Sequence, residues 1–203
     1  MKATATKAPE ETRHRILEAA FEEFYRNGFQ GGSLNHIIKE AGTTKGALFH
    51  HFDGKNALGY AVVDEVIQPQ IKADWLDPLS DSIDPVDDIK RVLQKYAEDG
   101  QNDETLVQGC PLSNLAQEMS PLDEGFRIRT DRLYTAWREA IAAALARGIK
   151  AGTVRKNISP RSVGTFLVAS LTGIIALAKN SQSDEVVKTA GDALFDYLDS
   201  LKP

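Results

Sequence analysis

Residues 33–52 read SLNHIIKEAGTTKGALFHHF, which predicts two short helices joined by a tight turn. Gly42 stands where a helix commonly ends in a left-handed residue, and Thr44 is the expected N-cap of the second helix. Two helices around a short turn that contains glycine form a helix-turn-helix, whose second helix enters the major groove of DNA. Four apolar residues at helical spacing give the first helix its apolar face: Leu34, Ile37, Ile38 and Ala41.

These residues and their flanks resemble the DNA-binding domain of tetracycline-repressor-type (TetR) transcriptional regulators. The resemblance implies an all-α homodimer with a shared N-terminal DNA-binding domain and a divergent C-terminal ligand domain. Where the family usually has Thr and Tyr, this chain has Gly32 and Phe49, so it lacks two hydroxyls that in the family can contact DNA phosphates. The resemblance covers residues 11–60 and rests on Gly28-Phe29, Ser33-Leu34, Ile37, Ala41-Gly42, KGALFHHF at 45–52 and KNAL at 55–58.

The helix-turn-helix and the resemblance together indicate which side chains contact DNA. Lys45 begins the second helix and is expected to reach a phosphate or a base edge, and His50 to donate to a phosphate. Lys55 begins the next helix, where charge and free amides act together on phosphate. Leu48 and Phe52 are expected in the core. The alternative is a solvated side chain or, for the threonines, a cap alone. The candidates are Ser33, Thr43, Thr44, Lys45, Gly46, Ala47, Phe49, His50 and Lys55.

The charge of the chain is unevenly distributed. The 203 residues can bury a full core, in one domain or two closely packed ones, and carry a net charge of −5. Residues 1–60 hold 8 basic and 7 acidic side chains, whereas residues 61–203 hold 16 and 22. The acidity therefore lies in the part that need not touch phosphate. Because residues 1–60, the DNA-binding head, are only weakly positive, helix N-termini and dimer symmetry must contribute to DNA binding.

The chain is predicted to be all-α, with no strand alternation. We expect a disordered tail at 1–10, a helix-turn-helix domain of three helices at 11–55, and a helical ligand-binding and dimerisation domain at 56–203. A helix from Asn56 is expected to kink at Pro69. A loop is expected at 76–84 and a turn at 101–103. Other helices are predicted up to Asn27, from Val86 to near Gly100, after Pro111, from Phe126 to near Gly152, and over 160–179 and 184–201.

Cysteine use and hydropathy indicate the compartment. A single cysteine excludes an intramolecular disulfide framework and fits a reducing cytosol. The first ten residues lack the apolar core of a signal peptide. The longest uncharged run, 162–178, is shorter than the ~20 residues of a membrane span. We therefore expect a cytoplasmic protein without a membrane segment.

The last two helices, 160–179 and 184–201, indicate a homodimer. They are apolar on more than one side, so they need a partner beyond their own core. Gly164, Ala169 and Gly173 permit close approach. The resemblance supplies the partner: two such helices from each chain form an intermolecular four-helix bundle. A palindromic operator also requires two-fold symmetry. The alternative is that these are internal core helices.

Cys110 lies in GCPLSNLAQE, residues 109–118. Pro111 suits the first position of a helix, which makes Cys110 the N-cap. Free amides and the helix dipole there are expected to lower the pKa of the thiol. The segment resembles a GC-x-x-x-N-L-A-x-E stretch of some TetR-type regulators, a subset of which sense electrophiles, so Cys110 is a candidate sensor of an electrophile or oxidant. The alternative is a small, inert cysteine in a pocket wall.

A ligand domain requires an effector pocket, whose ligand the sequence does not identify. If a small-molecule effector binds there, its coupling to DNA is reciprocal, and helix 56–75 is the expected lever. Residues of these types on such helices are more often plain core than ligand contacts. The candidates are Tyr96, Cys110, Asn114, Phe126, Tyr134, Trp137 and Phe166.

The rival function classes are an enzyme and an adaptor that uses the helix-turn-helix for protein contact. All four histidines lie within the first 51 residues, so the C-terminal part has no evident Cys-His or Ser-His pair and no histidine metal site. No glycine-rich loop of the G-x-x-x-x-G-K type is present. We therefore expect no catalytic residues, no metal and no cofactor. Specific binding to double-stranded operator DNA would separate a regulator from both alternatives.

Overall fold

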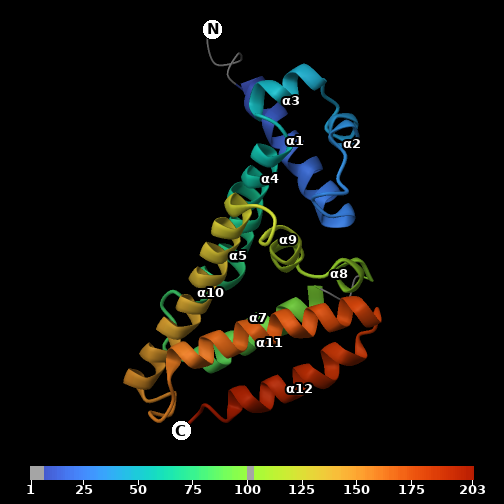
Figure 1. Cartoon of the computed structure of the whole chain (residues 1–203). Helices are drawn as coiled ribbons and strands as arrows, with labels where there is room; N and C mark the ends of the chain where they lie inside the picture. Colours follow the sequence, from blue (N-terminus) through green and yellow to red (C-terminus); the bar gives the residue numbers. More distant parts are fainter. Residues whose placement is uncertain (1–6, 100–102) are drawn as a thin grey trace. The chain divides into compact units, whose positions relative to one another are not determined.

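The computed structural model describes residues 7–99 and 103–203, and within these ranges every regular element is a helix (Figure 1). The predicted all-α fold is therefore confirmed. The elements are α1 (Lys7–Asn27), α2 (Leu34–Glu40), α3 (Lys45–His51), α4 (Lys55–Val62), η1 (Val63–Ile67), α5 (Gln68–Ile71), η2 (Lys72–Leu76), α6 (Asp77–Leu79), α7 (Pro85–Asp99), α8 (Asp103–Gln108), α9 (Pro111–Met119), α10 (Glu124–Ala151), α11 (Pro160–Ser181) and α12 (Glu185–Asp199).

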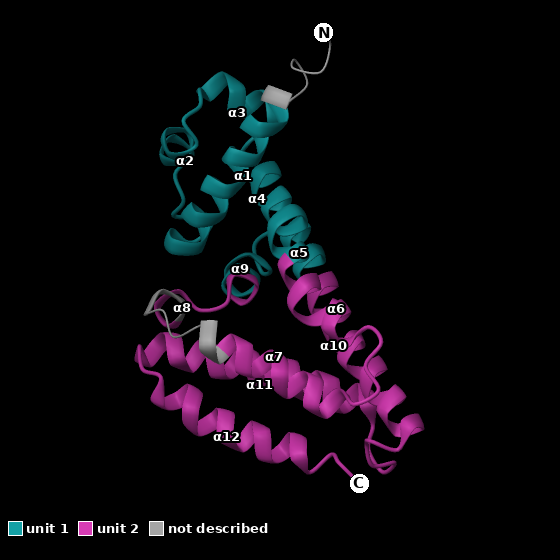
Figure 2. Cartoon of the chain, turned by 180° about the vertical axis from the view of Figure 1, so that it is seen from behind, with its two compact units in different colours: residues 1–69, 114–130 teal, residues 70–113, 131–203 magenta. Residues whose placement is uncertain are grey.

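The helices group into two compact units (Figure 2). Unit 1 combines the chain up to Pro69 with residues 114–130, and unit 2 holds residues 70–113 and 131–203. Unit 1 thus extends beyond residue 55, the predicted end of the DNA-binding domain. Both α9 and α10 begin in one unit and end in the other.

Unit 1 is built on α1, which packs against α2, α3 and α4. The apolar residues of α1 recur three to four positions apart, so they share one face, and that face is buried. Leu48 and Phe52 are buried as predicted. The N-terminal helix begins at Lys7, inside the predicted tail, whose residues 1–6 lie outside the described ranges.

Residues 55–79 form an unbroken helical run that contains two π-helical turns, η1 and η2. Pro69, where a kink was predicted, follows η1 by two residues, and Pro78 follows η2 at the same distance. A proline ring clashes with the carbonyl four residues back, and a π turn, which bonds five residues back, is a known way to absorb such a misfit. The predicted loop at 76–84 was wrong for residues 76–79, which are helical.

Unit 2 is held together by long helices. Among them α11 packs against α12 and α8, and α12 packs against α7. Lys90 of α7 lies 2.7 Å from a carboxylate oxygen of Asp199, and Lys202 lies 2.7 Å from Asp87, so ion pairs reinforce the α7–α12 contact. Asp103, predicted to lie in a turn with residues 101 and 102, begins helix α8; the other two residues lie outside the described ranges.

Helix α11 bears on the expectation about membrane segments, which stays a prediction. At 22 residues it is long and apolar enough to cross a membrane by length and composition, although its uncharged run is shorter. One third of its most apolar stretch is buried. Ser159 caps it by accepting from the Ser162 amide at 3.3 Å, as predicted. Gly164 lies where a Cβ would approach the Arg138 carbonyl to 2.7 Å, so this glycine serves packing inside unit 2.

Candidate DNA-binding surface and sensing region

The helix-turn-helix has the local structure that its sequence predicts. Ser33 caps α2 by accepting from the His36 amide at 3.3 Å, and Thr44 caps α3 by accepting from the Ala47 amide at 3.1 Å. Gly42 has φ +57°, the left-handed conformation that glycine adopts at least cost. Each helix is therefore capped at its N-terminus by a side chain, and the turn between them contains a left-handed glycine.

A buried carboxylate, which the sequence did not reveal, fixes α2 against α1. Glu23 is 5% exposed; its Oε1 accepts from the Ser33 amide at 2.7 Å, and its Oε2 lies 2.6 Å from His36 Nδ1 and 3.1 Å from Asn27 Nδ2. Burial alone would raise the pKa of Glu23, but the hydrogen bonds from Ser33 and His36 together hold it below its usual value. The start of α2 is thus attached to an ionised group inside unit 1.

The candidate DNA contacts lie on accessible surface. Ser33, Thr44, Lys45, Gly46, Phe49 and His50 are exposed, and Thr43, Ala47 and Lys55 are half-buried. The Lys45 ammonium lies 5.9 Å from the centre of the Phe49 ring, which is 43% exposed. Lys55 is engaged within unit 1: it donates to the Gln30 carbonyl at 3.0 Å and lies 5.1 Å from the centre of the Phe29 ring.

Segment 114–130 packs on this head through side chains that sequence reasoning did not single out. Glu118 accepts from the amides of Phe29 and Gln30, each at 2.8 Å. Asp123 accepts from the Tyr60 hydroxyl at 2.7 Å. The sequence pattern GC-x-x-x-N-L-A-x-E, which ends at Glu118, could have pointed to this residue.

Phe126, a candidate effector contact, lies in this packing. It is fully buried, with its ring centre 4.6 Å from that of Phe29 and 4.9 Å from that of Tyr60. Asn114, another candidate, also falls in unit 1. The remaining candidates, Tyr96, Cys110, Tyr134, Trp137 and Phe166, fall in unit 2.

Unit 2 contains an aromatic cluster around its two tryptophans. The Trp75 ring centre lies 4.8 Å from that of Trp137 and 5.7 Å from that of Tyr96. Tyr96 donates to Asp74 at 2.8 Å, and burial together with this carboxylate raises the pKa of its hydroxyl. The Trp137 side chain is 3% exposed, and its indole N–H has no hydrogen-bond partner among the described residues. Tyr134 is half-buried, and its burial raises the pKa of its hydroxyl.

Cys110 directly precedes α9, and the amides of Leu112 and Ser113 bond to its sulfur, as an N-cap requires. The predicted fall in its pKa is nevertheless wrong. Burial raises the pKa of the thiol, and the two amides only partly offset this. The helix terminus acts as predicted, but desolvation of the charged form is the larger effect.

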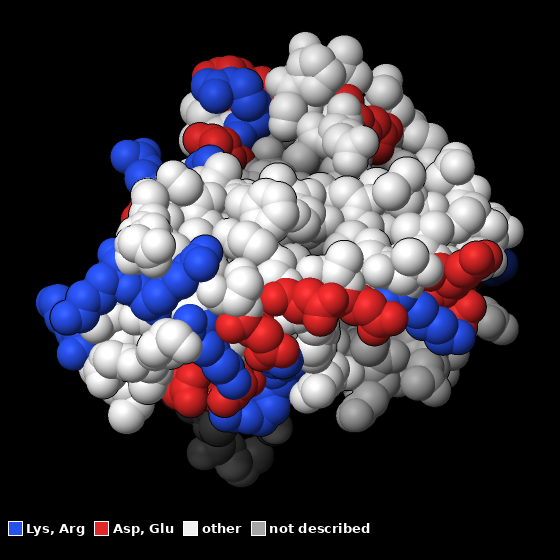
Figure 3. Space-filling model, turned by 90° about the horizontal axis from the view of Figure 1, so that it is seen from below, with Lys and Arg blue, Asp and Glu red and all other residues white. Residues whose placement is uncertain are grey.

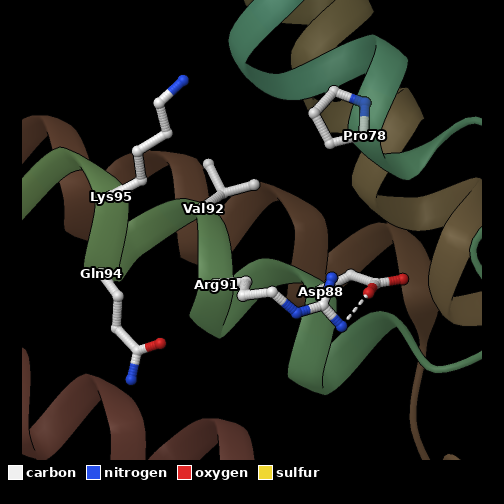
Figure 4. A pocket seen from close by; sticks show the side chains of 6 residues that line it. All are labelled: Pro78, Asp88, Arg91, Val92, Gln94 and Lys95. Atoms are coloured by element: carbon white, nitrogen blue, oxygen red, sulfur yellow. Dashed lines mark ion pairs between the residues drawn. The ribbon is translucent and has the colours of Figure 1, made fainter.

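Phe166 lies on the surface of α11, 48% exposed, with its ring centre 4.8 Å from that of Tyr197 on α12. A pocket of about 420 Å³ lies elsewhere in unit 2, between the end of the α4–α6 run and α7 (Figure 4). It is shallow and contains the Arg91–Asp88 ion pair, of 2.7 Å. None of the candidate effector contacts lines it; its lining residues are Pro78, Asp88, Arg91, Val92, Gln94 and Lys95.

The α12 end of the chain does not present a continuous basic surface. Figure 3 shows acidic side chains in a row across this face, basic side chains beside them and a broad uncharged area. Phosphate binding requires a predominantly positive surface.

Within the described ranges no group of three His, Cys, Asp or Glu side chains is arranged to hold a metal ion.

Comparison with known families matches both parts of the chain. Residues 16–62 match the family model described as bacterial regulatory proteins of the tetR family. Residues 85–194 match the model described as a tetracyclin repressor-like C-terminal domain. The first match contains α2, α3 and α4, and the second extends from α7 into α12.

Individual relatives agree with these models. The HTH-type transcriptional regulator LmrA of Bacillus subtilis is 33% identical, over 84% of this chain and 89% of its own length. The HTH-type transcriptional repressor DhaR of a Mycobacterium species is 28% identical, over 92% and 91%. A crystal structure of a TetR transcriptional regulator from Chloroflexus aurantiacus superimposes with a TM-score of 0.83 at 26% identity, and the match covers 97% of this chain and 98% of that one.

Proposed function

The chain belongs to the TetR family of helix-turn-helix transcriptional regulators, which are not enzymes, and on this premise we propose that it is a homodimeric cytoplasmic repressor. It binds a palindromic operator through α3 and releases it when a small-molecule effector binds unit 2. The observation that carries this proposal is the capped helix-turn-helix, whose Leu48 and Phe52 face the core while Lys45, Phe49 and His50 stay exposed.

The proposal is tested by binding to the intergenic DNA upstream of its own gene, measured by fluorescence anisotropy. We expect tight binding that a scrambled duplex of equal length and composition does not displace. Equal affinity for both duplexes would reject sequence-specific regulation through this DNA and favour the adaptor reading. The salt dependence of the affinity gives the number of phosphate contacts.

Dimerisation is proposed through α11 and α12, in keeping with the family, whose members act as dimers. Supporting side chains lie on the outer face of α11: Phe166 is 48% exposed and Leu177 is 59% exposed. Gly173 has nothing within 4 Å of the position of an added Cβ, so a second helix has room to approach closely. Sedimentation at micromolar concentration should give a dimer, and a Leu177→Asp variant should give a monomer.

The effector site is proposed at the aromatic cluster of unit 2. A buried N–H without a partner costs free energy, so a ligand that presents an acceptor to Trp137 would recover it. We therefore propose a small, largely apolar effector with at least one hydrogen-bond acceptor. Because both tryptophans lie in this cluster, intrinsic fluorescence reports on it directly. A compound that releases the operator should quench this fluorescence, and Trp137→Phe should weaken its binding.

Sensing of an electrophile or oxidant at Cys110 is a second form of this proposal. The amides of Leu112 and Ser113 favour a thiolate, and burial opposes it. The test is operator release by N-ethylmaleimide, which in wild type can label only the single cysteine, with Cys110→Ser as the control. Release in wild type alone supports the covalent form; a full adduct that leaves the operator bound rejects it.

A further inference from the structure

We infer that Glu118 is the positioning residue through which α9 sets the conformation of the DNA-binding head. This inference rests on the proposed function, because it states how the operator-binding surface is regulated. Glu118 comes from the segment between Cys110 and the start of α10, yet its carboxylate binds the loop between α1 and α2.

The contact is a two-point clamp on the backbone. Oε2 accepts from the Phe29 amide and Oε1 from the Gln30 amide, each at 2.8 Å. Hydrogen bonds to an ionised carboxylate are stronger than those between neutral groups. The loop is built for this approach: Gly28 has φ +73°, and a Cβ there would lie 3.1 Å from Glu118 Oε2. Another residue at position 28 would be strained and would crowd the clamp.

The clamped loop leads directly to the DNA-binding side chains. Glu118 holds the N–H of Gln30, and Lys55 holds its carbonyl at 3.0 Å. Lys55 is a candidate phosphate contact at the start of α4. The loop then ends at Ser33, whose hydroxyl caps α2 and whose amide is bound by Glu23. A displacement of the Glu118 carboxylate therefore acts on two DNA-facing positions, Lys55 and the start of α2.

Other contacts hold segment 114–130 to α4 and η1, so that Glu118 has a fixed base. Asp123 accepts from the Tyr60 hydroxyl at 2.7 Å and from Asn56 at 3.1 Å. Arg129 donates to Asp64 at 3.0 Å. These residues bind side chains of the helices, whereas Glu118 binds the backbone of the loop before α2. The clamp is thus the contact that can change the loop without detaching the segment.

Helix α9 connects this clamp to Cys110, the candidate sensor. It has nine residues and is about 13 Å long. Cys110 precedes its first residue, and Glu118 lies in its last turn. The helix also crosses from unit 2 to unit 1 between Ser113 and Asn114. Because a short helix moves largely as a rigid body, a change at its first turn shifts Glu118.

The test uses Glu118→Gln, which keeps the size of the side chain. Glutamine has one acceptor oxygen, and its NH₂ group would face an amide N–H, so one hydrogen bond is lost and two donors are opposed. The matched control is Glu124→Gln: Glu124 is exposed and pairs with Arg127 on its own helix at 2.6 Å. Three quantities are compared: affinity for the upstream intergenic duplex, the thermal midpoint, and hydrogen exchange of the peptide spanning 28–33.

We expect Glu118→Gln to weaken duplex binding about tenfold, to accelerate exchange at 28–33 and to lower the thermal midpoint by a few degrees, so affinity is compared at a temperature where both variants are folded. Glu124→Gln should change neither affinity nor exchange at 28–33. A residue with only a structural role would lower the midpoint and leave the affinity of the folded protein unchanged. That result, or unchanged exchange at 28–33, would overturn the inference.

The coupling to α9 is tested with N-ethylmaleimide at Cys110, the adduct being verified by mass. If the thiol does not react within a day, Cys110→Phe places similar bulk at the same position. We expect either change to weaken duplex binding at least fivefold in wild type and less than twofold in Glu118→Gln. No effect in wild type, or an equal effect in both proteins, would overturn the coupling. If wild type binds no duplex specifically, the proposed function fails, and exchange at 28–33 still decides whether α9 controls the loop through Glu118.

Discussion

The helices of the two units differ in what holds them in place. In unit 1, α2 and α3 have only seven residues each, too few for a stable helix in isolation. Their positions depend on the caps Ser33 and Thr44 and on the buried Glu23, all of which have partners. In unit 2, α10 and α11 have 28 and 22 residues and pack through apolar faces, while the Trp137 N–H stays unpaired inside. A satisfied network fixes the geometry of a surface, whereas an unsatisfied buried group costs free energy.

The largest effect should come from breaking the network of unit 1. Glu23→Ala leaves the Ser33 amide and the His36 ring without their carboxylate, and we expect a loss of about 3 kcal/mol in the free energy of unfolding. Urea titration followed by circular dichroism measures it. The control is Glu22→Ala, which removes an exposed partner of Arg26 and should cost under about 0.5 kcal/mol. Equal losses in the two variants would mean that the network does not hold α2.

The next effect separates the DNA-facing surface from the core of the same unit. Lys45→Ala should weaken operator binding by about 2 kcal/mol for a dimer and reduce the salt slope, with unfolding unchanged. Lys39→Ala is the control, because Lys39 is 80% exposed on α2 and outside the candidate set. If the two variants bind alike, α3 does not enter the groove with Lys45 leading.

What the sequence predicts well is what neighbouring residues decide. The caps Ser33 and Thr44, the left-handed Gly42 and the burial of Leu48 depend on contacts within a few residues. The role of Glu118 could not be predicted in this way, because its partners Phe29 and Gln30 lie almost ninety residues away. Nothing in the sequence around either partner predicts a contact over such a separation.

The prediction of a lowered pKa for the Cys110 thiol was wrong for a related reason. Its helix N-terminus is local and was predicted correctly, whereas its desolvation comes from the tertiary fold. The π turns before Pro69 and Pro78 show a third kind of limit. The sequence indicates that a proline must disturb a helix, but the neighbouring packing decides whether the helix breaks or widens.

A smaller effect is the pH dependence of stability that Glu23 gives to unit 1. The folded pKa of Glu23 lies below its unfolded value, so its contribution to stability is present above the unfolded pKa and is lost as pH falls through the folded pKa. Wild type should therefore lose stability more steeply than Glu23→Gln between about pH 5 and pH 3. Urea midpoints at half-unit steps of pH measure the difference. Parallel curves would show that Glu23 is not ionised in the folded protein.

The smallest effect concerns unit 2 and is a difference in the reaction rate of one thiol. Because burial raises the pKa of the Cys110 thiol, its thiolate fraction at pH 7 is lower than that of a free thiol, and the thiolate is the reacting species. A maleimide should react more slowly with the native chain than with the same chain in urea, where the single cysteine is solvated. A native rate equal to or above the unfolded rate would mean that the amides of Leu112 and Ser113 outweigh burial. Slow native reaction that a bound effector accelerates would instead show that effector binding in unit 2 changes access to the thiol.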